Sequence, residues 1–129
     1  MTAPNSPTAA TQRDSAPGEP VLFIYRLKPG AGPEYDRRHA AVWPALLAKI
    51  AEAGIEDYQI WRHQEIVVSR MRTRAGIRAA NAVLAASDIQ RAWTASLADL
   101  FAEITTPSGE PLWLDEVFRL AVRPATDAP

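Results

Sequence analysis

The sequence predicts one α+β domain in which helices cover one face of a single sheet. Apolar residues alternate with period two in some segments and recur with a helical period in others. These segments come in the order strand, helix, strand, strand, helices, strand. Residues 20–121 form the expected domain, with about 100 residues to build one modest core. Residues 1–19 and 122–129, rich in proline and alanine, are expected to be disordered tails.

The first strand is expected at 21–27, because VLFIYRL is a short run rich in strand-forming residues. Pro29 and Gly30 end it. A helix is expected from Pro33 to about Ala53, since proline suits the first turn of a helix. Pro44 lies inside this helix and lacks the N–H that its turn requires, so the sequence predicts a kinked helix.

Two strands, at 55–62 and 65–72, are expected next, and they are close enough to form a hairpin with His63 and Gln64 in its turn. Two helical stretches follow, at 76–86 and 88–104. Their apolar spacing fits helices that pack against a sheet.

The last strand is expected at 112–120, after a loop with proline and glycine. In one sheet, this order of elements gives a ferredoxin-like sandwich. The face of the sheet without helices would then be uncovered and apolar, which a monomer rarely tolerates. We therefore predict a homodimer that pairs two such faces.

Composition excludes several classes of function. The net charge is -1 and the pI is about 6.1, so no strong field attracts nucleic acid or an anionic membrane. No apolar run approaches the roughly 18 residues of a membrane span, and the N-terminus lacks the apolar core of a secretory signal. We expect a cytoplasmic protein. With no cysteine and two histidines, neither a metal nor a redox cofactor is expected.

The segment from Tyr35 to Pro44 carries the clearest chemical signal. Tyr35, His39 and Trp43 recur at i, i+4 and i+8, which places a phenol, an imidazole and an indole on one stripe of a helix. An imidazole exchanges protons near neutral pH, and aromatic rings hold the C–H faces of a sugar. The alternative is a buried helix face with a structural histidine.

These residues also carry a family resemblance. Tyr35-x3-His39-x3-Trp43-Pro44, Gly54-x3-Tyr58, Trp93 and Glu116-Val117-Phe118 resemble the L-rhamnose mutarotase family over nearly the whole expected domain. The resemblance implies a dimeric ferredoxin-like α/β barrel that acts on a small sugar. It also implies an isomerase that interconverts the α and β anomers of a reducing deoxy sugar by acid–base catalysis, without a cofactor.

The resemblance implies a role for individual residues. His39 occupies the position of the catalytic proton donor. The implied sugar contacts are Tyr35, Tyr58, Trp93, Thr94 and Trp43. Thr94 stands where the family has the second of two adjacent tryptophans, so part of the pocket wall differs.

Two alternative functions remain open from the sequence. The missing tryptophan, together with Arg70 and Arg72 on the third strand, also fits a repurposed pocket. Such a pocket would belong to a cofactor-free oxygenase or a cyclase acting on an aromatic or polyketide substrate. The second alternative is a non-catalytic dimeric binding module in which His39 is an ordinary buried residue.

Overall fold

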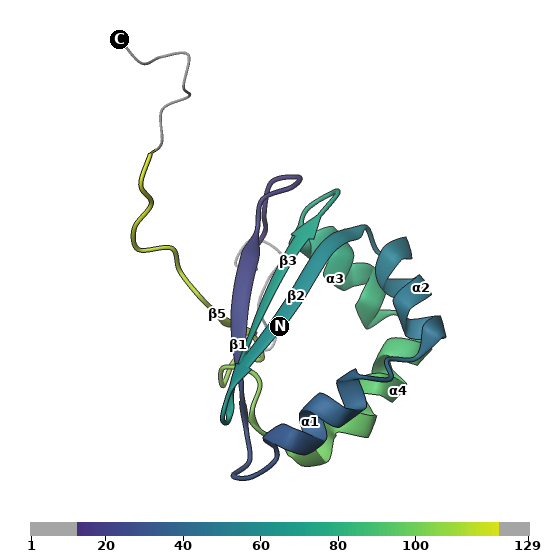
Figure 1. The fold of residues 1–129 in the computed structure, drawn as a ribbon. Coiled ribbons are helices and arrows are strands. Elements are labelled where there is room, and N and C mark those ends of the chain that lie inside the picture. Colours follow the sequence, from purple (N-terminus) through teal and green to yellow (C-terminus); the bar gives the residue numbers. More distant parts are fainter. Residues whose placement is uncertain (1–12, 122–129) are drawn as a thin grey trace, which may run out of the picture.

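The computed structural model describes residues 13–121 of the chain, and it confirms the α+β class and the ferredoxin-like sandwich. The sheet is antiparallel, in the order β2-β3-β1-β4, and β5 pairs with β1. The elements, labelled in Figure 1, are β1 (Val21–Leu27), α1 (Gly32–His39), α2 (Pro44–Glu52), β2 (Ile55–His63), β3 (Ile66–Thr73), α3 (Ile77–Ala85), α4 (Asp88–Leu97), the single 3-10 turn η1 (Ala98–Leu100), β4 (Phe101–Glu103) and β5 (Leu112–Trp113).

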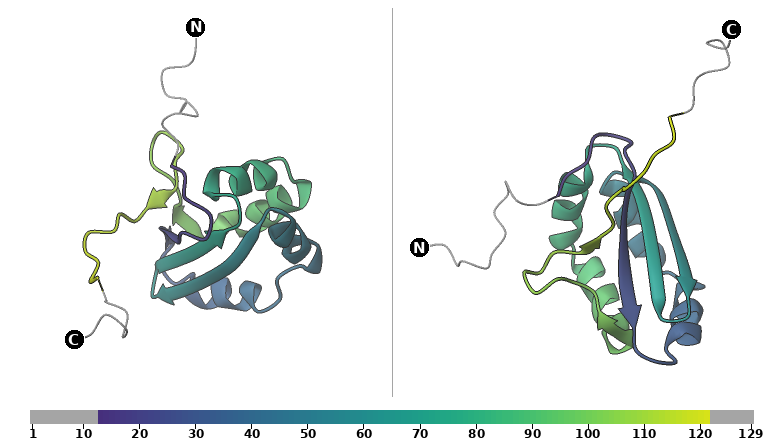
Figure 2. Two further views of the ribbon diagram at one scale, coloured as in Figure 1. Left: turned by 90° about the horizontal axis from the view of Figure 1, so that it is seen from above. Right: turned by 90° about the vertical axis from the view of Figure 1, so that its left-hand side faces the viewer.

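The four helices lie on one face of the sheet (Figures 1 and 2). Because side chains alternate along a strand, every second residue of β1 and β3 faces these helices. Phe23 of β1 and Val67 of β3 are buried there, together with Leu46 of α2 and Ile77 of α3. The core therefore lies between the sheet and the helices.

The prediction of one kinked helix from Pro33 to Ala53 was wrong, because the chain breaks completely into α1 and α2. Pro44 is the first residue of α2 instead of an interior residue. Its ring forces the preceding residue away from helical geometry, and Trp43 accordingly has an extended ψ of 131°. Trp43 thus lies outside the helical stripe that carries Tyr35 and His39.

The prediction of a helix over residues 88–104 was wrong at its end. Helix α4 stops at Leu97, and one 3-10 turn leads into β4. Phe101 pairs with Leu27 at the edge of β1, and Glu103 pairs with Arg26. Pairing with a distant strand overrides the local helical pattern, which no short window of sequence reveals.

The predicted last strand at 112–120 shrinks to Leu112 and Trp113. Beyond it, Leu114 donates a backbone hydrogen bond to Leu22, and the chain then leaves the domain without regular structure (Figure 2). Val117 is 95% exposed and Phe118 is 78% exposed. Among the described residues, no strand pairs with the chain after Leu114, and we call residues 115–121 the C-terminal arm.

No helix covers the second face of the sheet (Figure 2). Alternation places Leu22, Ile24 and Val68 on it, which agrees with the expected apolar character. The face is not uniformly apolar, however. Arg70 donates hydrogen bonds to Asp57 at 3.1 Å and to Gln59 at 2.9 Å, so a polar cluster crosses its middle.

Residues 13–19, which the prediction assigned to a tail, contact the domain at both of its ends. Ser15 Oγ accepts a hydrogen bond from the Ile77 N–H at the start of α3. Arg13 forms an ion pair with Asp115 at 2.6 Å. The remaining parts of the predicted tails, 1–12 and 122–129, lie outside the described residues.

Candidate functional site

His39 is the last residue of α1, and its ring is held between two aromatic side chains. The Tyr35 ring stacks on it with centroids 4.1 Å apart and planes 29° apart. This stacking follows from their four-residue spacing on one helix face. Trp93 of α4 meets the imidazole edge-on at 5.4 Å. The sequence thus brings a proton-exchanging group to a defined place on the helical side of the sheet.

One hydrogen bond fixes the protonation pattern of this imidazole. His39 Nδ1 lies 2.9 Å from the backbone carbonyl oxygen of Tyr35. A carbonyl only accepts hydrogen bonds, so Nδ1 must be the donor. In neutral His39 the lone pair is then on Nε2, and in the protonated form Nε2 carries a second N–H. Nε2 is therefore the nitrogen that remains available for proton exchange.

Three adjoining cavities lie near the helical face of the sheet, and His39 lines two of them. An outer cavity of about 500 Å³ is lined by Tyr35, His39, Tyr58 and Arg62, among others. A smaller one of about 210 Å³ lies between His39, Tyr58 and Trp93. The interior cavity, of about 520 Å³, extends between the sheet and the helices. Tyr58 borders all three, so it marks the centre of the candidate site.

All three tyrosines of the chain border these cavities. Burial raises the pKa of the Tyr25, Tyr35 and Tyr58 hydroxyls, and the nearby Tyr58 hydroxyl raises those of Tyr25 and Tyr35 further. Each phenol is therefore neutral at physiological pH and can donate one hydrogen bond. Three neutral donors in an apolar wall suit a ligand with several hydroxyl groups.

The predicted site residues come together in part. Tyr35, His39, Tyr58 and Trp93 lie around the same cavities. Thr94 lines the interior cavity, where its hydroxyl accepts a hydrogen bond from Gln90 at 3.3 Å.

Two other tryptophans, of which the resemblance implied only Trp43, lie differently from the four grouped residues. Trp43 packs edge-on against Trp93, with ring centroids 5.1 Å apart, and so helps to hold the Trp93 ring in place. Trp61 lines the outer cavity and is 53% exposed.

Sequence reasoning missed Tyr25 and the pair formed by Asp36 and Arg62. Tyr25 lines the interior cavity, held between Phe23 and Phe101 with ring centroids 5.3 and 5.2 Å away. Strand alternation from Phe23 is the signal that predicts its direction.

Arg62 donates two hydrogen bonds to the Asp36 carboxylate at the rim of the outer cavity, with N–O distances of 2.8 and 2.6 Å. These bonds lower the pKa of the Asp36 carboxyl. The pair joins β2 to α1 across that rim. It leaves the rim polar without a net charge from these two residues.

Within residues 13–121, no cluster of three metal-ligating side chains is found. In the same part of the chain, no helix is long and apolar enough to cross a membrane. The arrangement around His39 offers instead one proton-exchanging nitrogen, neutral phenols and aromatic rings. Such a set of groups can bind a polyhydroxylated ring and move protons on it.

Comparison with known proteins gives a consistent result. The family model for L-rhamnose mutarotase matches residues 21–120. The L-rhamnose mutarotase of Burkholderia ambifaria is 40% identical over 96 residues, which are 73% of this chain and 88% of that protein. The corresponding protein of Verminephrobacter eiseniae is 42% identical over 100 residues, covering 73% and 91%. A crystal structure of L-rhamnose mutarotase from Formosa agariphila shares the fold, with a TM-score of 0.63 at 23% identity, covering 80% of this chain and 99% of that one.

Proposed function

Because this chain belongs to the L-rhamnose mutarotase family, we propose that it is an isomerase that interconverts the α and β anomers of L-rhamnose. The observation that carries the mechanism is the hydrogen bond from His39 Nδ1 to the Tyr35 carbonyl. It leaves Nε2 as the exchanging nitrogen beside a cavity lined by tyrosines. Neither the oxygenase or cyclase alternative nor the binding-module alternative is favoured by the relatives.

Exchange of anomers requires the sugar ring to open and to close again. In the proposed step, protonated His39 donates its Nε2 proton to the ring oxygen while the bond from that oxygen to the anomeric carbon breaks. The anomeric hydroxyl then loses its proton to Nε2, which leaves a neutral open-chain aldehyde. Closure on the other face of the carbonyl reverses these transfers. Protons and electrons balance, and His39 is regenerated.

The tyrosines position the sugar in this mechanism. Their raised pKa values make them poor acids, so they are suited to hold hydroxyl groups. Tyr35 and Tyr58 are the proposed partners of sugar hydroxyls near His39, and Tyr25 is a third candidate deeper in the interior cavity. Trp93 supplies the aromatic wall. Thr94 leaves the cavity wider at the position where a larger side chain would project into it.

The test is saturation-transfer NMR of L-rhamnose, which measures the exchange rate between anomers directly. His39→Ala should lower the enzymatic rate by about 10²–10⁴-fold, the usual value of general acid–base catalysis. His63→Ala is the matched control, because His63 lies exposed at the end of β2 and lines none of the cavities around His39. Full activity in a folded His39→Ala protein would remove His39 from the mechanism.

We also propose that the protein is a homodimer and that it is cytoplasmic. The uncovered sheet face supports a second copy as partner, because Leu22, Ile24 and Val68 have no helix packed over them. The C-terminal arm supports the same partner, since Val117 and Phe118 are exposed apolar residues within the family match. For the location, the cysteine-free sequence fits a reducing compartment.

A further inference from the structure

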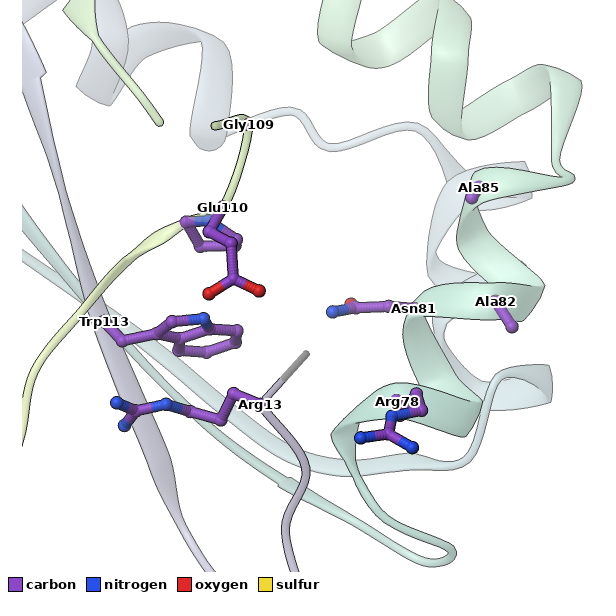
Figure 3. Close-up of a pocket in the computed structure, with 9 residues that line it drawn as sticks. Arg13, Arg78, Asn81, Ala82, Ala85, Gly109, Glu110 and Trp113 are labelled. Carbon is purple, nitrogen blue, oxygen red and sulfur yellow. The ribbon is translucent and has the colours of Figure 1, made fainter. Parts of the chain in front are cut away.

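A separate cavity of about 380 Å³ lies between α3 and the loop that leads into β5 (Figure 3). Arg13, Arg78, Asn81, Glu110 and Trp113 supply its polar and aromatic lining. None of these residues borders the two cavities that contain His39. We propose that this cavity, the α3 pocket, is a second binding site, and that its ligand is a neutral polyhydroxylated ring such as a sugar.

One wall of the α3 pocket comes from residues before the family match, which begins at residue 21. Asp14 Oδ1 accepts a hydrogen bond from the Arg78 N–H at 3.1 Å, and Ser15 Oγ accepts one from the Ile77 N–H at 2.9 Å. These bonds satisfy backbone donors in the first turn of α3. They also fix the position from which Arg13 reaches the pocket, so the wall is a built part of the fold.

Charge balance disfavours an anionic ligand. The Arg13 guanidinium already pairs with Asp115, and the Asp14 carboxylate lies beside Arg78 and has a lowered pKa because of backbone hydrogen bonds and that charge. Among the described residues, no ion pair includes Glu110. Its carboxylate therefore remains an acceptor for hydroxyl groups, and it would repel a phosphate or a carboxylate.

The geometry of the polar groups suits a ring with hydroxyls on its edge. Figure 3 shows the Glu110 carboxylate and the Asn81 amide pointing toward each other across the α3 pocket. An amide both donates and accepts hydrogen bonds, whereas a carboxylate only accepts. Together they match hydroxyl groups, which also do both.

Trp113 provides the apolar surface that the C–H face of a sugar requires. Its ring is held by Phe23, edge-on at 5.6 Å, and by the Arg13 guanidinium 5.3 Å from its centroid. A rigid ring loses little entropy when a ligand packs on it. Its indole N–H is buried and has no hydrogen-bond partner among the described residues.

The α3 pocket adjoins the interior cavity, because Asn81 and Trp113 line both. A ligand in it would therefore lie close to the proposed catalytic cavity without contacting His39. The proposal does not rest on mutarotase activity, since binding at this place follows from its own residues. The two ideas can be tested separately with a sugar that cannot mutarotate.

The experiment titrates methyl α-L-rhamnopyranoside, whose anomeric centre is blocked, into the full chain and follows indole N–H signals by NMR. The four tryptophans give four indole signals, and Trp113→Phe identifies the one from Trp113. We expect a saturable shift of that signal at millimolar sugar, in the native protein and equally in His39→Ala. Glu110→Ala and Asn81→Ala should each weaken binding about tenfold, as for the loss of one good hydrogen bond.

Glu56→Ala is the matched control, because Glu56 is an exposed carboxylate that lines neither the α3 pocket nor the cavities around His39. No shift of the Trp113 signal with folded protein would overturn the proposal. So would a stronger response to inorganic phosphate than to the glycoside, which would indicate an anion site. Loss of L-rhamnose exchange in His39→Ala, with a Trp113 response that is kept there and weakened by Glu110→Ala, would support both sites independently, because Glu110 lines the α3 pocket and not the interior cavity.

Discussion

The two faces of the sheet come from the same three long strands, yet helices cover one face and leave the other open. On the helical face, Leu46 is 2% exposed and Val67 is fully buried. On the open face, Trp61 is 53% exposed and Arg70 holds Asp57 and Gln59 in a polar cluster. The candidate catalytic site lies on the helical face. The difference teaches that the core and the candidate site share one face, while the other face is open for the proposed dimer.

The largest expected effect is the loss of stability caused by a cavity in the core beneath the helical face. Leu46→Ala should lower the free energy of unfolding by about 2–5 kcal/mol, because this buried side chain packs in the same cluster as Tyr35 and Trp93. Urea denaturation measures the change. Leu47→Ala is the control, since the neighbouring side chain is 53% exposed. Equal losses in both variants would contradict the idea that burial of Leu46 against the helical face of the sheet is what stabilises the fold.

The next effect concerns assembly. Val68 pairs with Ile24 on one side and with Trp61 on the other, so it lies near the middle of the open face. Val68→Asp should convert the proposed dimer into a folded monomer, because a carboxylate at a buried apolar interface loses its hydration. Light scattering after gel filtration gives the molar mass.

Val67→Asp sharpens the same comparison. Val67 precedes Val68 in β3, but it points into the core and is fully buried. A carboxylate at this position should unfold the protein, as followed by circular dichroism. A native protein that is monomeric at micromolar concentration would refute the dimer itself.

A smaller effect is expected from the polar cluster on the open face. Asp57→Asn removes the charge that pairs with Arg70, and in the isolated protomer it should cost about 0.2–1 kcal/mol, since the Asp57 side chain is 36% exposed there. A double-mutant cycle with Arg70→Met isolates this pair by chemical denaturation. A coupling energy that does not shrink in high salt would contradict a solvated pair.

The smallest effect is the pH dependence of the stability that Glu34, on the outer side of helix α1, contributes. Hydrogen bonds from Arg37 and Arg38 lower the pKa of Glu34 from 4.5 to about 2. A carboxyl group with a lowered folded-state pKa stabilises the protein fully above its unfolded value, and the contribution disappears as the pH falls through the folded value. Stability from Glu34 should therefore decline from about pH 4.5 towards pH 2.

Glu34→Gln tests this dependence through thermal midpoints measured across that acidic range. The variant should lose stability less steeply with acid than the native protein. The difference should be small, because solvent screens the partly exposed ion pairs of Glu34 with Arg37 and Arg38. Identical acid profiles for the two proteins would show that the ion pairs of α1 do not contribute to folding.

Local signals predicted what local physics controls. Strand β1, the β2–β3 hairpin and the stacking of Tyr35 with His39 follow from side-chain periods within a few residues. The complete break before Pro44 was also within reach, because proline restricts the residue that precedes it.

Other features depend on long-range contacts that no local pattern contains. Strand β4 exists because Phe101 pairs with Leu27, which lies more than seventy residues earlier in the chain. Tyr25 joins the candidate site because β1 lies at the centre of the sheet. Residues 13–15 help to build the α3 pocket only through contacts with α3 and with the segment after β5. Pairing and docking over such distances explain why these features escaped prediction.

The partner of His39 Nδ1 is a main-chain oxygen, and this gives the site a particular robustness over evolution. Every amino acid at position 35 would supply the same carbonyl at the same helical offset, so no side-chain substitution at that position deletes the acceptor. The placement of the proton on the ring is thus inherited from the helix. The side chains that line the cavity can then change by substitution while the imidazole keeps its orientation.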